Sequence, residues 1–495
     1  MLGIFGIMNL IHKIVKEIIS SSAEKEVERF LKVLLQNTIF KNKTFAVGGY
    51  VRDEYMGLEA KDLDIVVEMK DGAKKLTQYI YDEVNDSEKI STPRQMGANY
   101  PIWQITFKDS IFYKNEMYNT RGAIIEFADT MKESFPNEES RQRVTEYGTL
   151  EQDIERRDFL TNMLLKDLTT SEIIDLTGSS KHDIQKGILR GHPKVSLDTI
   201  FANDPLRMIR LIRFQAKYDW QIPLSVLKTV KRNAKRIEIV SSERIMGELQ
   251  KLMAIGKLYK AIKLMKIVGL LKYVIPEVEV MKDVIQDKKH HGEGDVLKHT
   301  LLVLKNAPKT VEGQLAALLH DVGKAKTQQI LEDKIQFLGH EEVGAEMAEA
   351  ILYRLKFDKV TIDKVVKLVR EHMRPHSLEN AGQKAFRKLI RDMGDELTDA
   401  LLDLAEADSL GSYPVENVIP NLREEIDRIR KAPVKMEKKP VLNGQEIMDL
   451  LHVKSGPKIG EISKFLLDLQ DEYAERNEIL TKEIAKEKVL EHEKK

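Results

Sequence analysis

Two carboxylates separated by one residue, Asp62 and Asp64, follow a glycine pair at Gly48-Gly49. Side chains two residues apart on a strand point to the same face, so a strand through this segment would place both carboxylates together, facing the glycine turn. Paired carboxylates bind divalent metal ions, and backbone amides at a glycine turn that opens a helix bind phosphate. The pattern predicts a site for a nucleoside triphosphate with bound Mg²⁺.

A third carboxylate is expected because metal-assisted transfer of a phosphoryl or nucleotidyl group uses two or three of them in a small space. The segment AIIEFAD supplies Glu126 as the preferred candidate and Asp129 as the alternative. An isolated Asp-x-Asp pair is usually a surface feature. The glycine turn, followed directly by Arg52 and Asp53, is what favours a functional site.

A second set of metal-ligand types lies in the C-terminal half, where histidines and aspartates occur on or at the ends of apolar helical segments. These residues are His299, His320, Asp321, His340, His372 and Asp408. Neutral imidazoles and carboxylates on facing helices suit Mg, Mn, Fe, Ni or Zn, and a bound ion can activate water against a phosphate ester. A single histidine on an apolar helix is more often a core residue, whereas this grouping favours a metal site.

The elements that must position these residues change in character along the chain. Strand patterns occur at 45–49, 62–68, 100–107 and 123–129, and a helix is expected at 71–84. After residue 151 strand patterns nearly vanish and helical periodicity predominates. We therefore predict an α+β protein, with a small mixed α/β domain followed by predominantly helical parts. The expected divisions are 1–150, 151–285, 286–412 and 413–495.

The composition of the 495-residue chain is that of a globular protein, with 42% hydrophobic residues and a formal net charge of zero. Net charge decides nothing about a nucleic-acid partner, because basic residues can cluster in a neutral chain. The chain has no cysteine, which excludes disulfides and thiolate metal sites and fits a reducing cytosol. The first eleven residues are apolar but too short to span a bilayer. We expect them in a packed amphipathic helix, with a peripheral membrane anchor as the alternative.

Three ordered motifs resemble the class II tRNA nucleotidyltransferase and bacterial poly(A) polymerase superfamily. They are GGYVRD with KDLDIVVE, IERRDFLTNMLLKD at 154–167, and NDPLRMIRLIRF at 203–214. The resemblance implies a nucleotidyltransferase head at 1–150 and a helical neck at 151–285, with Asp62, Asp64 and Glu126 as the catalytic carboxylates. It also implies a set of nucleotide-binding residues, namely Gly48, Gly49, Arg52, Asp53, Arg157, Asp158, Asn162, Asp204, Arg207 and Arg210.

The resemblance further implies that Asp204 and Arg207 read the base, and a spacing of three residues would put them on one helix face. A carboxylate accepts from an exocyclic amino group and a guanidinium donates to a ring nitrogen, so the pair would accept C and A and reject U and G. Taken alone, the two residues would be a surface ion pair. The chain departs from the family at Asn203, where a glutamate is usual, and at Met131, where an arginine is frequent.

The histidine–aspartate pattern resembles the HD phosphohydrolase superfamily, especially the HD domain fused to some bacterial tRNA nucleotidyltransferases. The resemblance implies that His299, His320, Asp321 and Asp408 bind a divalent transition metal. It leaves His340 and His372 to line the site or to hold a second ion. The segment from 441 to 470 resembles the tail of the same group, which is expected to help hold the tRNA elbow, with Lys454, Lys458 and Lys464 near backbone phosphate.

Together the motifs predict a cytoplasmic, template-independent enzyme that builds or repairs the 3′ CCA end of tRNA from CTP and ATP. The expected partners are tRNA and the two nucleotides, with no membrane. One alternative is an enzyme that adds only A, to tRNA or as a poly(A) tail. Alternatives from other classes are an HD phosphohydrolase with an idle transferase head and a non-catalytic RNA-binding scaffold. The fused HD domain favours the tRNA enzyme, and the intact aspartate pair favours an active head.

Overall fold

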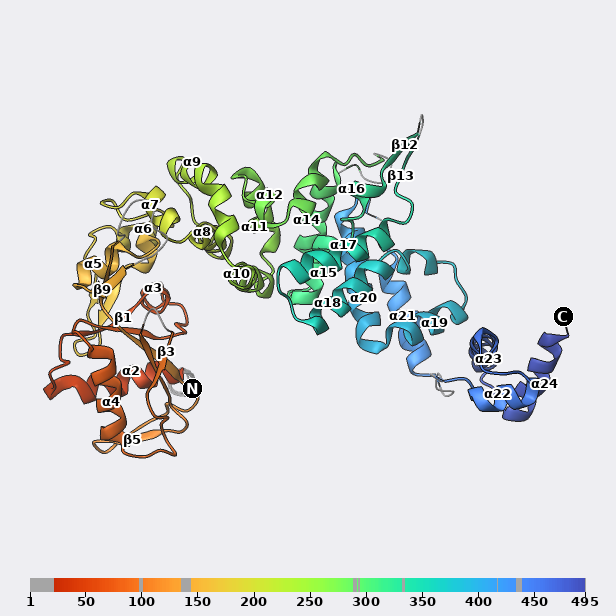
Figure 1. Ribbon diagram of the computed structural model, residues 1–495, viewed down its shortest axis with the longest axis horizontal. Coiled ribbons are helices and arrows are strands. Elements are labelled where there is room, and N and C mark those ends of the chain that lie inside the picture. Colours follow the sequence, from red (N-terminus) through yellow and green to blue (C-terminus); the bar gives the residue numbers. More distant parts are fainter. Residues whose placement is uncertain are drawn as a thin grey trace, which may run out of the picture. The chain divides into compact units, whose positions relative to one another are not determined.

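The computed structural model describes residues 22–97, 101–134, 144–287, 292, 294–331, 334–415, 417–432 and 439–494. The chain divides into two compact units, Met1–Arg236 and Ile237–Lys495, which follow each other along the colour scale of Figure 1. The apolar segment at the first eleven residues lies outside the described residues.

A seven-stranded mixed sheet forms the centre of the first unit, in the order β11-β10-β1-β2-β7-β4-β3. β2 and β7 are parallel, and the other neighbouring strands are antiparallel. The strands are β1 Thr44–Val47, β2 Asp64–Val67, β3 Arg94–Met96, β4 Ile102–Thr106, β7 Ile124–Asp129, β10 Leu165–Asp167 and β11 Ile173–Ile174. The four predicted strand segments are confirmed as β1, β2, β4 and β7.

Helices and two further hairpins complete this unit. The helices are α2 Ala23–Leu34, α3 Gly49–Tyr55, α4 Gly72–Val84, α5 Leu150–Glu155, α6 Ser180–Lys186, α7 Leu197–Asn203, α8 Leu206–Tyr218 and α9 Leu224–Asn233, with the 3₁₀ helix η2 at Leu160–Asn162. The hairpins pair β5 Ile111–Tyr113 with β6 Glu116–Tyr118, and β8 Met131–Ser134 with β9 Val144–Tyr147. The helix predicted at 71–84 is confirmed as α4.

Strands β10 and β11 lie in a segment for which we predicted helices, so that prediction was wrong for residues 165–174. β10 pairs with β1, and Val47 is opposite Leu165. Strands of two and three residues are too short to show an alternating pattern, and the partner of β10 lies more than a hundred residues earlier in the chain. The sheet therefore extends beyond residue 150, and the predicted division at that position stays a prediction.

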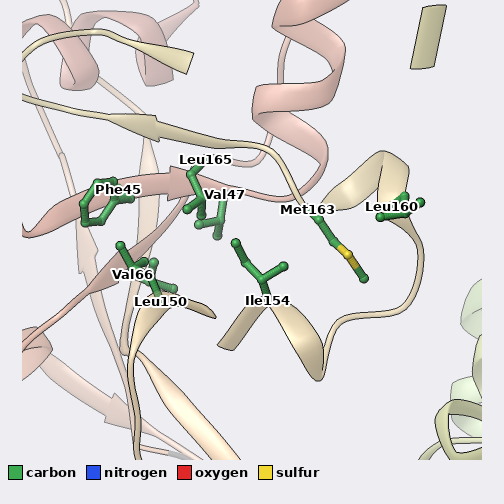
Figure 2. Close-up of a cluster of buried hydrophobic side chains, with 8 residues drawn as sticks. All are labelled: Phe45, Val47, Val66, Leu150, Ile154, Leu160, Met163 and Leu165. Atoms are coloured by element: carbon green, nitrogen blue, oxygen red, sulfur yellow. The ribbon is translucent and has the colours of Figure 1, made fainter. Parts of the chain in front are cut away.

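An apolar cluster fastens α5 and η2 to the middle of the sheet (Figure 2). Phe45 and Val47 are two residues apart on β1 and so share a face, while Val66 and Leu165 are their cross-strand partners. The full cluster is Phe45, Val47, Val66, Leu150, Ile154, Leu160, Met163 and Leu165. Burial of each large side chain contributes roughly 1.5–3 kcal/mol, so the packing holds residues 150–163 firmly against the strand that ends at the glycine turn.

The second unit is helical apart from one hairpin, β12 Gln329–Leu331 with β13 Lys334–Gln336. Its helices up to residue 411 are α10 Ser242–Ala254, α11 Leu258–Ile267, α12 Leu271–Val274, α13 Pro276–Glu279, α14 Val296–Asn306, α15 Val311–Leu319, α16 Lys324–Thr327, α17 His340–Arg354, α18 Lys359–Glu371, α19 Gln383–Met393 and α20 Asp395–Gly411. Helices α14, α15, α17, α18 and α20 pack together around the predicted histidine site.

The C-terminal part continues with α21 Ile419–Arg430, α22 Gly444–Leu451, α23 Pro457–Glu475 and α24 Lys482–Glu493. The last three helices share an apolar cluster that includes Leu442, Ile447, Ile462, Leu466 and Val489. The predicted helical tail is therefore present. None of the helices in the described part of the chain has the length and apolar character needed to cross a bilayer.

Candidate active site and candidate metal centre

The predicted glycine turn connects β1 to α3. Gly48 has a φ of +72°, in the left-handed region that glycine adopts without strain. Gly49, the first residue of α3, follows directly and lies next to the Arg52 guanidinium. Asp64 is the first residue of β2 and pairs with Val47, the last residue before the turn. The register therefore places Asp64 beside the turn.

Asp62 precedes β2 and has a φ of +58°, so the expectation that both aspartates lie on the strand is wrong. The Asp64 side chain reaches solvent, but protein atoms crowd the carboxyl group on its other sides. Burial raises the pKa of Asp64 to about 6, the Glu126 and Asp62 carboxylates add to the effect, and the Arg157 guanidinium opposes it. Asp62 is therefore close enough to raise the pKa of Asp64, although the two side chains do not alternate along one strand.

Glu126 is the cross-strand partner of Asp64 on the parallel strand β7. Its Oε1 accepts a hydrogen bond of 3.3 Å from Gln104 Nε2 on β4. Asp129 instead pairs with Val67, and its Oδ1 accepts from the backbone N–H of Ala73 at 2.8 Å, at the start of α4. The geometry favours Glu126 over Asp129 as the third carboxylate.

The three carboxylates form a donor set of hard oxygens, which suits a divalent cation such as Mg²⁺. The like charges that raise the pKa of Asp64 would be neutralised by that cation. The oxygens of Asp62, Asp64 and Glu126 do not all lie within 4.8 Å of one another among the described residues. A cation at Asp64 would therefore need at least one of the three side chains to turn toward it.

A buried carboxylate that the sequence analysis missed, Asp153, holds two arginines of the second motif. Arg156 donates to Oδ1 at 2.6 and 2.9 Å, and Arg157 donates to Oδ2 at 2.8 and 3.1 Å. Burial would raise the pKa of Asp153, but the two guanidinium groups outweigh it and lower the pKa. Nη1 of Arg157 lies 3.9 Å from the position of a β-carbon on Gly48. The hydrogen bonds to Asp153 therefore keep Arg157 at the glycine turn. The spacing of three and four residues between Asp153 and the arginines is a signal that could have identified it.

A chain of hydrogen bonds joins the three sequence motifs. Arg52 Nη1 donates to Asn162 Oδ1 at 2.5 Å, Asn162 Nδ2 donates to Asp158 Oδ1 at 2.9 Å, and Arg210 Nε donates to Asp158 Oδ2 at 2.9 Å. Burial would raise the pKa of Asp158, but Arg210 and Asn162 outweigh it and lower the pKa. These side chains therefore bind one another next to the turn. Arg52 Nε also donates to Asp53 Oδ1 at 2.8 Å.

The expectation that Asp204 and Arg207 share one helix face is wrong. Asp204 lies between α7 and α8, where its Oδ1 accepts from the backbone N–H of Leu206 at 3.2 Å. Pro205 explains the break, because proline disfavours a helical conformation in the residue before it. The Arg207 guanidinium donates to the backbone oxygens of Arg156 and Ile200 at 2.8 and 3.4 Å. Arg207 thus contacts the backbone of Arg156, and the role of both residues in base recognition stays a prediction.

The predicted histidines and aspartates of the second unit form two groups whose ligand atoms lie within 4.8 Å of one another, namely His299, His320 and Asp408, and Asp321, His340 and His372. In the first group, His299 Nε2 lies 2.9 Å from Asp408 Oδ1 and 3.3 Å from His320 Nε2. Asp321 directs Oδ2 toward His320 at 3.3 Å and Oδ1 toward His340 at 3.5 Å. Three of the four predicted ligands fall in the first group, whereas the fourth, Asp321, falls in the second group with His340 and His372 and lies between the two.

The hydrogen bonds of the imidazoles show that these groups fit metal ions. Nδ1 of His320, His340 and His372 lies 2.9, 2.9 and 2.7 Å from a backbone carbonyl oxygen. A carbonyl only accepts, so each Nδ1 carries the proton and each Nε2 presents a lone pair. The Nε2 atoms of His340 and His372 are 3.2 Å apart, and burial lowers the pKa of His372 to about 3. Two facing lone pairs repel, and a cation between them would replace the repulsion with attraction.

A cavity of about 490 Å³ opens onto this centre, and its walls include Asp321, His340 and Asp408. Two further ionisable wall residues, His376 and Lys324, were not predicted. His376 Nε2 lies 3.4 Å from Asp408 Oδ2, and Lys324 Nζ lies 2.7 Å from Asp321 Oδ2. A cationic side chain beside metal ligands suits a phosphate group. Lys324 follows His320-Asp321 within the HDVGK segment, and that short spacing is a signal that could have identified it.

Comparison with protein families assigns the parts of the chain in order. Residues 44–190 match the poly A polymerase head domain, 220–282 match the probable RNA and SrmB-binding site of polymerase A, and 296–412 match the HD domain. The chain is 32% identical over 337 residues to the CC-adding tRNA nucleotidyltransferase of Thermus thermophilus. The aligned region covers 66% of this chain and 74% of that protein. It is 29% identical over 356 residues to the multifunctional CCA protein of Neisseria meningitidis, and the aligned region covers 70% of this chain and 77% of that protein.

Solved structures show the same fold. The CCA-adding enzyme of Bacillus stearothermophilus in complex with CTP has a TM-score of 0.62 at 17% identity and covers 90% of this chain and 92% of its own. The CCA-adding enzyme of Thermotoga maritima complexed with tRNA has a TM-score of 0.55 at 17% identity, covering 94% and 95%. The predicted fold class, a mixed α/β head followed by helical parts, is confirmed.

Proposed function

The chain belongs to the tRNA nucleotidyltransferase family, and we propose that it is the CCA-adding enzyme that builds or repairs the 3′ end of tRNA from CTP and ATP. The observation that carries this proposal is the position of Asp64 between the glycine turn and Glu126. We place the activity in the cytoplasm, in keeping with a chain that has no cysteine.

In the proposed reaction the 3′ hydroxyl of the tRNA attacks the α-phosphate of CTP or ATP. A new P–O bond forms, and the bond to pyrophosphate breaks. Asp62, Asp64 and Glu126 would hold Mg²⁺, which when bound supplies charge stabilisation for the attacking and leaving oxygens. The amides at Gly48 and Gly49 would orient the triphosphate.

Arginines supply the positive charge around that triphosphate. Arg157, fixed by Asp153, faces the turn and would neutralise the charge that moves onto the departing pyrophosphate. Arg52, Asp53, Asp158, Asn162 and Arg210 would support the site from below through their mutual hydrogen bonds. The network keeps the glycine turn and α8 in a fixed relation before nucleotide arrives.

Base selection in this proposal belongs to Asp204 and Arg207. The Asp204 carboxylate would accept from the amino group of cytosine or adenine, and the Arg207 guanidinium would donate to the neighbouring ring nitrogen. Although the two residues do not share a helix face, both lie at the N-terminal end of α8. A base can therefore meet both groups at the junction of α7 and α8.

A second candidate function is addition of CC alone. It is favoured by the 32% identity to a relative named as a CC-adding tRNA nucleotidyltransferase. The A-adding enzyme and the poly(A) polymerase remain alternatives within the same class, because the same motifs serve all of them. An HD phosphohydrolase with an idle head would leave the arrangement around Asp64 without a use.

The HD centre would add a metal-dependent phosphohydrolase activity. His299, His320 and Asp408 would hold one divalent transition metal ion, and Asp321, His340 and His372 a second. A metal ion bound there supplies activated water for attack on a phosphate ester. Lys324 would bind the phosphate from the cavity wall.

The deciding experiment uses a tRNA that ends before CCA, incubated with Mg²⁺ and with CTP, ATP, or both. Complete CCA with both nucleotides supports the first proposal, and CC as the only product supports the second. Addition of A without C supports the A-adding alternative. Equal use of UTP or GTP contradicts the base-reading role, and absence of any incorporation overturns the transferase proposal.

A further inference from the structure

The last residue of α8, Tyr218, hydrogen-bonds to the helix that opens at the glycine turn. Its hydroxyl accepts from Arg52 Nη2 at 2.8 Å and donates to Asp53 Oδ1 at 2.9 Å. Arg52 Nε donates to the same Asp53 oxygen at 2.8 Å, so the three side chains close a ring of hydrogen bonds. The contact joins residues more than 160 positions apart in the chain.

The ring of Tyr218 is held independently of its hydroxyl. It stacks on Trp220 with ring centroids 4.6 Å apart and an angle of 22°. The Arg52 guanidinium lies 5.0 Å from the Tyr218 ring centroid and 5.2 Å from that of Phe214. A phenylalanine at this position would keep the stacking and lose only the two hydrogen bonds.

Helix α8 is therefore tied to α3 at two places. Near its beginning, Arg210 reaches Arg52 through Asp158 and Asn162. At its end, Tyr218 reaches Arg52 and Asp53 directly. Two attachments fix both the distance and the tilt of a helix, whereas one attachment fixes only a pivot. Because α8 is also held by seven buried side chains, the tie through Tyr218 fixes the final tilt of its C-terminal end against α3 rather than holding the helix alone.

We propose that Tyr218 is a positioning residue for nucleotide selection. This inference rests on the proposed function, in which the turn holds the triphosphate and the N-terminal end of α8 reads the base. A nucleotide whose phosphates are fixed at the turn presents its base at one distance, so selection depends on how α8 is held. Hydroxyl loss would let α8 tilt, and the pair formed by Asp204 and Arg207 would no longer meet the base edge in register.

The test compares Tyr218→Phe with Tyr50→Phe in the full-length enzyme. Tyr50 offers a control on α3, where it is buried and its hydroxyl donates to Glu28 Oε2 at 2.7 Å, away from Asp53. Both variants lose one hydroxyl with a carboxylate partner. The first readout is kcat/KM for CTP divided by kcat/KM for UTP, measured on tRNA lacking CCA. The second is the Kd for UTP divided by the Kd for CTP, measured by calorimetry with Mg²⁺ and no tRNA.

Tyr218→Phe is expected to lower both ratios about tenfold, with a larger change in KM than in kcat, because hydrogen bonds that fix recognition groups control discrimination. Tyr50→Phe is expected to leave both ratios at the wild-type value. Unchanged ratios in Tyr218→Phe, or an equal loss in Tyr50→Phe, overturn the proposal. A wild-type protein that binds CTP over UTP but transfers neither refutes the proposed function, and the Kd ratios then still decide the role of Tyr218. Equal wild-type binding of both nucleotides overturns the inference.

Discussion

Asp64 and Glu126 are direct partners on the neighbouring parallel strands β2 and β7. The pairing holds two carboxylates beside each other, and burial together with the Glu126 charge raises the pKa of Asp64 to about 6. A fold gains nothing in stability from this arrangement without a cation, because like charges on adjacent strands are unfavourable. The pairing therefore indicates a site built for a ligand.

Replacement of Asp64 by Asn is expected to reduce kcat for nucleotide addition about a thousandfold, the loss of several kcal/mol of charge stabilisation. Asp129→Asn is the matched control, since Asp129 lies on β7 but accepts from Ala73 at the start of α4. That variant should retain kcat within a few-fold, measured on tRNA lacking CCA. An equal loss in both variants would assign the effect to folding of the sheet.

Replacement of Asp153 by Asn removes the charge that holds Arg156 and Arg157. Loss of one partner from a buried ion pair destabilises a protein by about 3–5 kcal/mol, so the thermal midpoint should fall clearly. KM for CTP and ATP should rise, because Arg157 would no longer be held at the turn. Glu151→Gln on the same helix, an exposed position, should change neither quantity. A normal KM in Asp153→Asn would show that Arg157 is held by other contacts.

His192 predicts a pH dependence of stability. Burial lowers its pKa from the usual 6.5, and Lys194 adds to the effect while Glu155 opposes it. The unfolded chain therefore binds a proton at higher pH than the folded chain, and the contribution of His192 to stability is lost as the pH falls below 6.5. His192→Gln should lose less thermal stability than wild type between pH 7.5 and 5.5. Parallel losses in the two proteins would contradict the buried neutral imidazole.

Metal content should report the two ligand groups of the HD centre separately. Native mass spectrometry of wild type after loading with a divalent transition metal is expected to show two ions for each chain. His299→Ala and His372→Ala should each lose one, because they remove a ligand from different groups. His452→Ala, an exposed tail histidine, is the control and should keep both. One ion in the wild type would show that the two groups act as a single site. CCA addition should persist in all three variants, because the transferase carboxylates lie in the other unit.

The sequence allowed prediction of those parts of the site that depend on neighbouring residues. The turn at Gly48, the strand after Asp64 and the helix at 72–84 follow from local patterns, and the structure agrees with them. The gathering of histidines and aspartates in the second unit was also predictable, because they lie on or beside apolar helical segments, and their role as metal ligands stays a prediction. The position of Asp62 was predicted less well, since a left-handed backbone at an aspartate leaves no trace in a hydrophobic pattern.

Long-range contacts could not be predicted in the same way. Tyr218 meets Asp53 across 165 positions, and nothing in the pattern of α8 distinguishes its hydroxyl from that of a surface tyrosine. Asp204 differs for a local reason, because Pro205 disfavours a helical conformation in the residue before it. A family resemblance supplied roles for Asp53 and Asp204 but none for Tyr218, and the structure was needed to show which groups bind one another.

Strand β10 has a consequence for synthesis of the chain. It is the neighbour of β1, yet it is translated about 120 residues later. Until it emerges from the ribosome, β1 presents an unpaired edge, and exposed edges invite pairing with other chains. A nascent fragment ending at residue 150 would carry the glycine turn on a sheet that lacks β10 and β11. The sheet that supports the catalytic centre can therefore be completed only after residue 174 has been made.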